Sequence, residues 1–247
     1  MNVIEYGKEN RSVILLLHGG GLSWWNFRAE AELLGDRYRV VLPVLDGHAD
    51  SDADFTGIED NAARILAHID QAFGGSVLAV GGLSLGAQVA AEMLSQRPDV
   101  CRYAVLESAS VIPSGVTHAL IGPAFASSYG LVRQKWFAKM QFDYLRIRAD
   151  LFEDYYRDTV KISRENMIAF LKANTAYAPK PGLRDSRARV RMVVGGKEQK
   201  RMLRSAALLK DLLPGSTVEM KDGLYHGEYS INHPEQYAED LLEMLRG

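Results

Sequence analysis

The sequence contains only one cysteine, Cys101, among its 247 residues. An intramolecular disulfide is therefore excluded, and such low cysteine usage is typical of proteins in a reducing compartment. Residues 1–8 carry neither the basic nor the apolar segment of a secretory leader, and no apolar run has the length that crosses a bilayer. We therefore expect a soluble, cytoplasmic protein with no membrane partner.

The sequence also lacks an excess of charge of one sign. It holds 29 lysines and arginines against 31 aspartates and glutamates, a net charge of -2. Nucleic-acid binders usually carry a strong basic excess, so we expect no nucleic-acid partner. The length and the apolar fraction of 47% fit one α/β domain with an insertion. We expect a small-molecule substrate and a monomer or homodimer.

Short apolar runs alternate with helical segments at both ends of the sequence. Strands are predicted at 13–17, 39–42, 76–80, 103–106, 190–194 and 217–221. Helices are predicted at 25–34, 59–73, 85–96, 200–213 and 234–246. This alternation predicts an α/β fold with a mostly parallel central sheet and helices on both faces.

The segment 113–186 has a different pattern. Aromatic residues, methionines and charges occur there at helical spacing, with almost no β-branched runs, which predicts an all-helical insertion. Pro179 and Pro181 should end it with an extended return to the sheet. We therefore predict a core of residues 1–112 and 187–247, with the insertion placed after the strand at 103–106.

The sequence Gly82-Leu83-Ser84-Leu85-Gly86 joins a predicted strand to a predicted helix. A serine on such a turn adopts a strained backbone conformation, and the flanking glycines allow the strand and the helix to approach closely. A serine hydroxyl held in this setting is suited to act as a nucleophile. Because a hydroxyl is a weak nucleophile at neutral pH, it also needs a base.

Four motifs together resemble the α/β-hydrolase family with a helical cap. Each follows a predicted strand: His18-Gly19-Gly20-Gly21, Asp46-Gly47-His48-Ala49-Asp50-Ser51, Gly82-Leu83-Ser84-Leu85-Gly86 and Tyr225-His226-Gly227. The second motif departs from the family's usual Gly-His-Gly-x-Ser, and the early hairpin is shortened to about residues 3–7. The resemblance implies the α/β-hydrolase fold, a cap at 113–186 and a serine hydrolase that uses neither cofactor nor metal.

The resemblance also implies a catalytic triad of serine, histidine and acid. Ser84 is the expected nucleophile, and His226, in the loop after the last strand, is the expected base. The family commonly places the acid in a Gly-x-x-Asp pattern after the strand that follows the insertion, where this chain has Glu198. Glu107, which directly follows the strand at 103–106, occupies the alternative position that some members use.

Two backbone amides are expected to stabilise the oxyanion. One belongs to Leu85, at a helix N-terminus, and the other to Gly20, with its neighbour Gly21 as the alternative. The remaining candidates are pocket residues: Gly21, Trp24, Trp25, Phe125 and Trp136. At most one of the two adjacent tryptophans should face the site, and the aromatic residues of the insertion equally suit helix packing.

These residues predict cleavage of a small, largely apolar ester through an acyl-enzyme. Related scaffolds use the same triad on thioesters or carbon–carbon bonds, or in lyase reactions. Other members of the fold bind a ligand and signal with little turnover. The sequence leaves these alternatives open, because fold likeness does not determine function.

Overall fold

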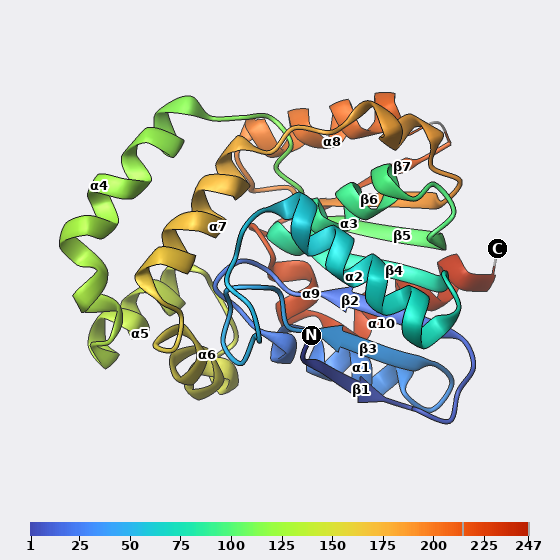
Figure 1. Cartoon of the computed structure of the whole chain (residues 1–247), viewed down its shortest axis with the longest axis horizontal. Helices are drawn as coiled ribbons and strands as arrows, with labels where there is room; N and C mark the ends of the chain where they lie inside the picture. Colours follow the sequence, from blue (N-terminus) through green and yellow to red (C-terminus); the bar gives the residue numbers. More distant parts are fainter. Residues whose placement is uncertain (214, 247) are drawn as a thin grey trace.

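The computed structural model describes residues 1–213 and 215–246 and is built around a seven-stranded sheet (Figure 1). The strands are β1 Val3–Tyr6, β2 Val13–Leu17, β3 Arg39–Pro43, β4 Val77–Leu83, β5 Cys101–Glu107, β6 Arg189–Gly195 and β7 Thr217–Lys221. Their order is β1-β3-β2-β4-β5-β6-β7, and β1 pairs antiparallel with β3, whereas the other neighbours are parallel. The predicted mostly parallel α/β sheet is confirmed.

Helices follow most of the strands. The α-helices are α1 Arg28–Leu34, α2 Ile58–Phe73, α3 Leu85–Gln96, α4 Gly115–Val132, α5 Lys135–Tyr144, α6 Phe152–Thr159, α7 Arg164–Ala176, α8 Lys200–Leu212, α9 Glu228–Asn232 and α10 Pro234–Arg246. Three 3-10 helices are η1 Trp24–Phe27, η2 Ala149–Leu151 and η3 Pro181–Asp185. No helix in the described part of the chain is long and apolar enough to span a membrane.

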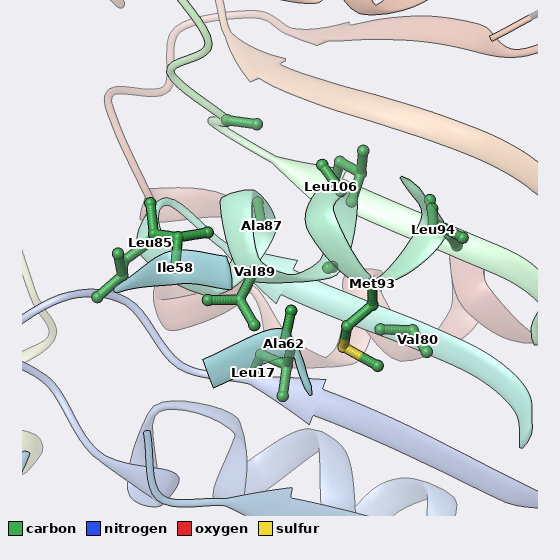
Figure 2. Packing of buried hydrophobic residues seen from close by; sticks show 14 of the residues in the cluster. Leu17, Ile58, Ala62, Val80, Leu85, Ala87, Val89, Met93, Leu94 and Leu106 are labelled. Atoms are coloured by element: carbon green, nitrogen blue, oxygen red, sulfur yellow. The ribbon is translucent and has the colours of Figure 1, made fainter. Parts of the chain in front are cut away.

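The inner strands β3, β2, β4, β5 and β6 are largely buried on both faces, which explains their apolar runs, whereas the edge strands β1 and β7 are more exposed. In β2, Leu15 and Leu17 join the core cluster that includes α2 and α3, whereas Ile14 and Leu16 join the cluster that includes α1 and α10. Figure 2 shows the first cluster, with α3 packed over β4 and beside α2. Burial of each large aliphatic side chain contributes about 1.5–3 kcal/mol, so this double-sided packing holds the sheet edge that carries the site.

Several elements differ from the sequence prediction. β4 continues past residue 80 to Leu83 because Gly81 and Gly82 pair with β5, and the Tyr237 hydroxyl fills the space beside Gly81. The predicted helix 25–34 begins as the 3-10 turn η1. The expected extended return after Pro181 is wrong, because η3 forms there and packs against α3. The short helix α9 was not predicted, since five residues carry too little periodicity.

Helices α4 to α7 connect β5 to β6 and gather at one end of the sheet (Figure 1). α4 packs mainly on α7, and α5 packs on α6. The insertion is tied to the rest of the chain by polar contacts: Asn174 of α7 donates to Gln88 of α3 at 2.9 Å, and Trp25 donates to Asp158 of α6 at 3.0 Å. These buried contacts fix the helices against the carboxyl ends of the strands.

The turn between β4 and α3 is tight enough to require two glycines. Ser84 lies in it with φ 52° and ψ −109°, a conformation that few non-glycine residues adopt. A Cβ at Gly82 would lie 2.4 Å from the Gly86 carbonyl oxygen, and one at Gly86 would lie 2.1 Å from the Leu17 carbonyl oxygen. Both obstacles are backbone atoms, so a side chain there forces the strand and the helix apart.

We expect Gly86→Ala to lower the free energy of unfolding by about 2 kcal/mol or more, the usual scale of overpacking. Urea unfolding measures the loss. Gly115→Ala is the matched control, because nothing lies within 4 Å of a Cβ at that position. Its stability should stay unchanged or rise by up to about 1 kcal/mol. Equal stabilities of the two variants would contradict the close contact at Gly86.

Candidate active site

Ser84, His226 and Glu198 form one hydrogen-bonded chain. The Ser84 Oγ lies 3.0 Å from the His226 Nε2, and the His226 Nδ1 lies 2.7 Å from the Glu198 Oε2. The three residues follow β4, β7 and β6, whose carboxyl ends meet at one edge because the strands are parallel. Since a carboxylate only accepts, Nδ1 carries the donated proton and Nε2 is left to accept from the serine.

The Glu198 carboxylate is held by three donors. Besides His226, its Oε1 accepts from the Gly195 amide at 2.8 Å and from the Ser108 hydroxyl at 2.7 Å, and its side chain is 1% exposed. Burial alone would raise the pKa of Glu198, but the hydrogen bonds and the charge of His226 outweigh it and hold the pKa below its usual value. The carboxyl group is therefore ionised at neutral pH.

The alternative acid, Glu107, lies nearby in a different environment. It is buried, and its Oε1 accepts from the Ser230 amide at 3.2 Å. Burial, together with the charge of Glu198, raises the pKa of Glu107 to about 7 against the opposing effects of the Ser230 contact and His226. Because the His226 ring is bonded to Glu198 instead, the geometry favours Glu198 as the acid of the chain.

In the glycine loop after β2, residues 18–21, the amides of Gly19 and Gly21 already donate hydrogen bonds. The Gly19 amide donates to the Asn26 Oδ1 at 3.1 Å, and the Gly21 amide donates to the His48 Nε2 at 3.0 Å. Within the described residues, the amides of Gly20 and Leu85 form no hydrogen bond. The Leu85 amide is the first of α3, where the helix dipole favours an anion. The loop therefore leaves the Gly20 amide available rather than that of Gly21.

Two neutral histidines hold this loop in shape. The His18 Nδ1 donates to the Gly19 carbonyl at 2.9 Å while its Nε2 accepts from the Leu45 amide, and the His48 Nδ1 donates to the Asp46 carbonyl at 3.0 Å. Burial lowers the pKa of His18 to about 3 and that of His48 to about 4. Both rings therefore stay uncharged at neutral pH, so that each can donate through Nδ1 and accept through Nε2.

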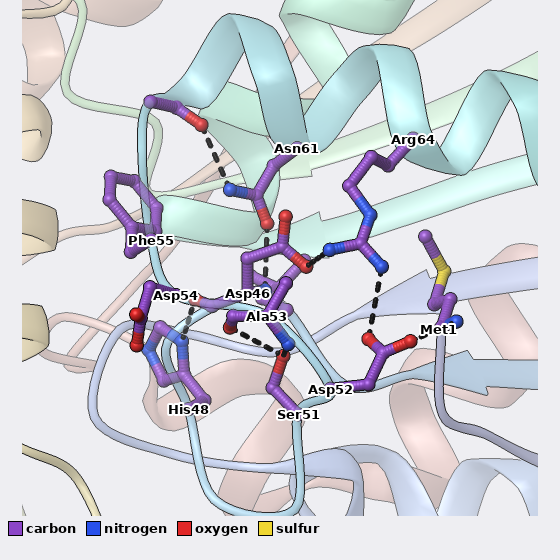
Figure 3. Close-up of polar contacts among 12 residues, drawn as sticks. Met1, Asp46, His48, Ser51, Asp52, Ala53, Asp54, Phe55, Asn61 and Arg64 are labelled. Carbon is purple, nitrogen blue, oxygen red and sulfur yellow. Dashed lines mark hydrogen bonds and ion pairs between the residues drawn. The ribbon is translucent and has the colours of Figure 1, made fainter.

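The segment that carries His48 is anchored by a polar network that runs from the buried Asp46 to the exposed Asp52 (Figure 3). The Asp46 amide donates to the Asn61 Oδ1 at 2.8 Å, and Arg64 bridges the carboxylates of Asp46 and Asp52, each at 3.0 Å. Asp46 is 2% exposed, so its charge needs the arginine. The network fixes the segment after β3 and thereby the ring that holds Gly21.

The structure places the predicted pocket residues in different surroundings. Trp25 is 1% exposed, and its Nε1 donates to the buried Asp158. Trp136 is 63% exposed on α5, where its ring contacts Phe137. Trp24 lies under the Arg28 guanidinium at 4.8 Å, and Phe125 packs half-buried against the core.

An aromatic ring that no sequence motif indicated lies at the glycine loop. Phe170 of α7 stacks on His48 with ring centroids 4.6 Å apart, and a Cβ at Gly20 would lie 3.4 Å from it. Ser108, which supports Glu198 with φ 53°, was also missed. Neither residue belongs to a local motif, because each meets its partner across a long stretch of sequence.

The comparisons place the chain in a known family. The model of the alpha/beta hydrolase family matches residues 14–240, so the chain belongs to that family. A curated AB hydrolase superfamily protein from Gibberella zeae is 29% identical over 136 residues, which cover 52% of this chain and 45% of that protein. The match thus spans less than half of the relative's length.

Solved structures share the fold at low sequence identity. An esterase from Exiguobacterium antarcticum has a TM-score of 0.83 and 18% identity, with 99% of this chain and 95% of the other covered. The enol-lactonase from Burkholderia xenovorans LB400 has a TM-score of 0.82 and 15% identity, covering 100% and 96%. A thermophilic esterase from Thermogutta terrifontis reaches 0.79 at 18% identity, covering 99% and 92%.

The environment of Glu107 predicts a pH dependence of stability. Its pKa is about 7 in the folded state against 4.5 as the ordinary value, so the folded state binds the proton more tightly. Its contribution to the free energy of unfolding is therefore greatest below pH 4.5 and falls by up to about 3 kcal/mol as the pH rises to 7. Glu107→Gln removes this loss.

Urea unfolding of the wild type and Glu107→Gln at pH 5, 6, 7 and 8 measures the effect. The variant should gain stability relative to the wild type as the pH rises, because it keeps the Ser230 contact without titrating. Comparing the two proteins at each pH cancels the titration of all other groups. A stability difference that is the same at all four pH values would refute the raised pKa.

Proposed function

We propose that this chain is a serine hydrolase that cleaves a small, largely apolar ester without a cofactor. The observation that carries the proposal is the hydrogen-bonded chain from Ser84 through His226 to Glu198, beside the unpaired amides of Gly20 and Leu85. The names of the structural neighbours, two esterases and an enol-lactonase, support an ester or lactone bond as the target.

In the proposed reaction the Ser84 Oγ attacks the ester carbonyl carbon while its proton moves to the His226 Nε2. Glu198 stabilises the imidazolium that forms, and the tetrahedral oxyanion accepts hydrogen bonds from the Gly20 and Leu85 amides. The intermediate collapses by breaking the carbon–oxygen bond to the alcohol, which takes the proton from Nε2. An acyl group is then bonded to Ser84.

Water completes the cycle by the same steps. His226 takes a proton from water, the hydroxide attacks the acyl carbonyl, and collapse returns the proton to the Ser84 Oγ as the acid leaves. The low pKa of Glu198 keeps it ionised throughout, so that the positive ring always faces a negative partner. No redox or metal step is needed for this balance.

We further propose that residues 113–186 act as a cap on a core formed by 1–112 and 187–247. Two contacts support this role at the glycine loop: Phe170 lies against Gly20, and the Thr159 hydroxyl donates to the Gly21 carbonyl at 3.4 Å. Both come from the insertion. The apolar ring beside an oxyanion donor suits an ester whose acyl part is apolar.

A fluorophosphonate probe tests the nucleophile. We expect one covalent adduct per chain, because the serine attacks phosphorus as it attacks a carbonyl and the adduct cannot be hydrolysed quickly. Intact mass spectrometry counts the adducts. Ser84→Ala should remove the adduct, whereas Ser108→Ala should retain it. An adduct that persists in Ser84→Ala sinks the proposal.

Replacing each of the two carboxyl groups by an amide tests the acid. Glu198→Gln should lower kcat/KM by about a thousandfold or more, because an amide neither fixes the ring nor stabilises its charge. Glu107→Gln makes the same chemical change one strand away and should keep kcat/KM within about threefold, less than about 1 kcal/mol. Hydrolysis of 4-nitrophenyl butyrate measures both. The reverse ranking would assign the acid to Glu107.

A further inference from the structure

Two cations lie over one aromatic ring next to the base. The guanidinium carbon of Arg146 is 3.9 Å from the centroid of the Tyr225 ring, and the ammonium of Lys197 is 5.2 Å from it. Tyr225 directly precedes His226, and Lys197 directly precedes Glu198. Within the described part of the chain neither cation forms an ion pair with a carboxylate. Two positive charges therefore lie at the ring of the residue before His226, and one of them, on Lys197, belongs to the residue before Glu198.

The position of Arg146 is specified by the segment that carries His226. Arg146 has φ 57°, a left-handed conformation that costs free energy for a residue with a side chain. Asn232, the last residue of α9, donates to the Arg146 carbonyl at 2.7 Å and accepts from the Arg148 amide at 3.0 Å. These two hydrogen bonds attach the loop between α5 and η2 to α9, which begins just after Gly227. The backbone at Arg146 is therefore held by specific hydrogen bonds.

The acidic groups around the two cations are engaged elsewhere. Glu198 accepts from His226, Gly195 and Ser108, and Glu228 accepts from the Tyr225 amide at 2.7 Å. The His226 side chain is 47% exposed, and both cations are exposed as well. Two exposed cations therefore lie at the Tyr225 ring, and among the described residues neither has an ion-pair partner.

We propose that Arg146 and Lys197 bind a carboxylate of the substrate, carried on the part of the ester remote from the bond that is cleaved. A guanidinium is a planar fork that matches a carboxylate, and stacking on the Tyr225 ring orients it in advance. The neighbouring ammonium adds a second charge. This inference rests on the proposed ester hydrolysis and refines its substrate class: a small ester that is apolar near the carbonyl and anionic at its far end.

The chain-wide net charge of -2 gives no sign of this site, because it averages over the whole surface. Recognition depends on local charge within about one Debye length, about 8–10 Å at physiological salt. Arg146 belongs to the insertion and Lys197 to the loop after β6, so the two cations are 51 positions apart in the sequence. Only the fold brings them to one ring.

Matched ester pairs test the proposal. One pair carries the charge on the acyl side, mono-4-nitrophenyl adipate against 4-nitrophenyl hexanoate. The other carries it on the alcohol side, 3-carboxyphenyl butyrate against 3-carbamoylphenyl butyrate. Rates measured with Ser84→Ala are subtracted as background. In at least one pair we expect the wild type to prefer the carboxylate, with a lower KM and a preference that shrinks as salt rises.

Variants then assign the preference to the two cations. Arg146→Gln and Lys197→Gln together should raise the KM for the preferred anionic ester about tenfold, the scale of two partly exposed ion pairs, and leave the neutral ester within about twofold. Arg146→Lys should retain part of the preference, since it keeps charge without the fork. Arg133→Gln, an exposed arginine of the same insertion, is the control and should change neither ester.

The outcomes separate this inference from the proposed function. If the wild type prefers the carboxylate ester in neither pair, or if the variants slow the neutral and the anionic ester equally, the carboxylate site is overturned while ester hydrolysis stands. If no ester is cleaved, the labelling rate of Ser84 by a fluorophosphonate ending in a carboxylate is compared with that of its amide analogue, and equal rates overturn the site. Absence of labelling by either probe overturns the proposed function, and the inference falls with it.

Discussion

The contact between the backbone of α3 and the end of β2 sets the geometry of the site. Gly86 approaches the Leu17 carbonyl so closely that a side chain cannot fit between them. Because Leu17 is followed at once by the glycine loop, this contact brings the amide of Leu85 and the hydroxyl of Ser84 beside Gly20. The proposed nucleophile and both candidate oxyanion donors are therefore placed by a single backbone approach, which the buried side chains of α3 keep closed (Figure 2).

Two carboxyl groups at the same sheet edge show how surroundings assign different states to similar residues. Glu198 receives hydrogen bonds from a ring, an amide and a hydroxyl, which stabilise its charge. Glu107 is at least as buried but accepts only the Ser230 amide on one oxygen, and its other oxygen has no partner among the described residues. Desolvation therefore raises the pKa of Glu107, whereas the hydrogen-bond donors and the charge of His226 hold the pKa of Glu198 below its usual value. The ionised group is the one that faces His226.

Local patterns predicted most of the sheet, and the resemblance of four short motifs to the α/β-hydrolase family implied the three residues of the hydrogen-bonded chain, with Glu107 as the alternative acid. The serine turn, the glycine loop and the histidine loop each fall within a few residues, so their spacing carries the signal. Ser108, Phe170 and Arg146 could not be found this way, because each meets its partner across a large separation in sequence. The tryptophans failed for a related reason: helical spacing shows which side chains share a face, but not which face is covered.

Asn232 separates the path of one loop from the identity of a single residue in it. Its side chain holds the backbone on both sides of residue 147, so the course of the loop does not depend on the side chain at position 146 alone. The groups proposed to break the ester bond all come from the sheet core. Substitution at position 146 would therefore change the proposed carboxylate site and leave the proposed chemistry in place, so that substrate preference and bond cleavage could be altered separately.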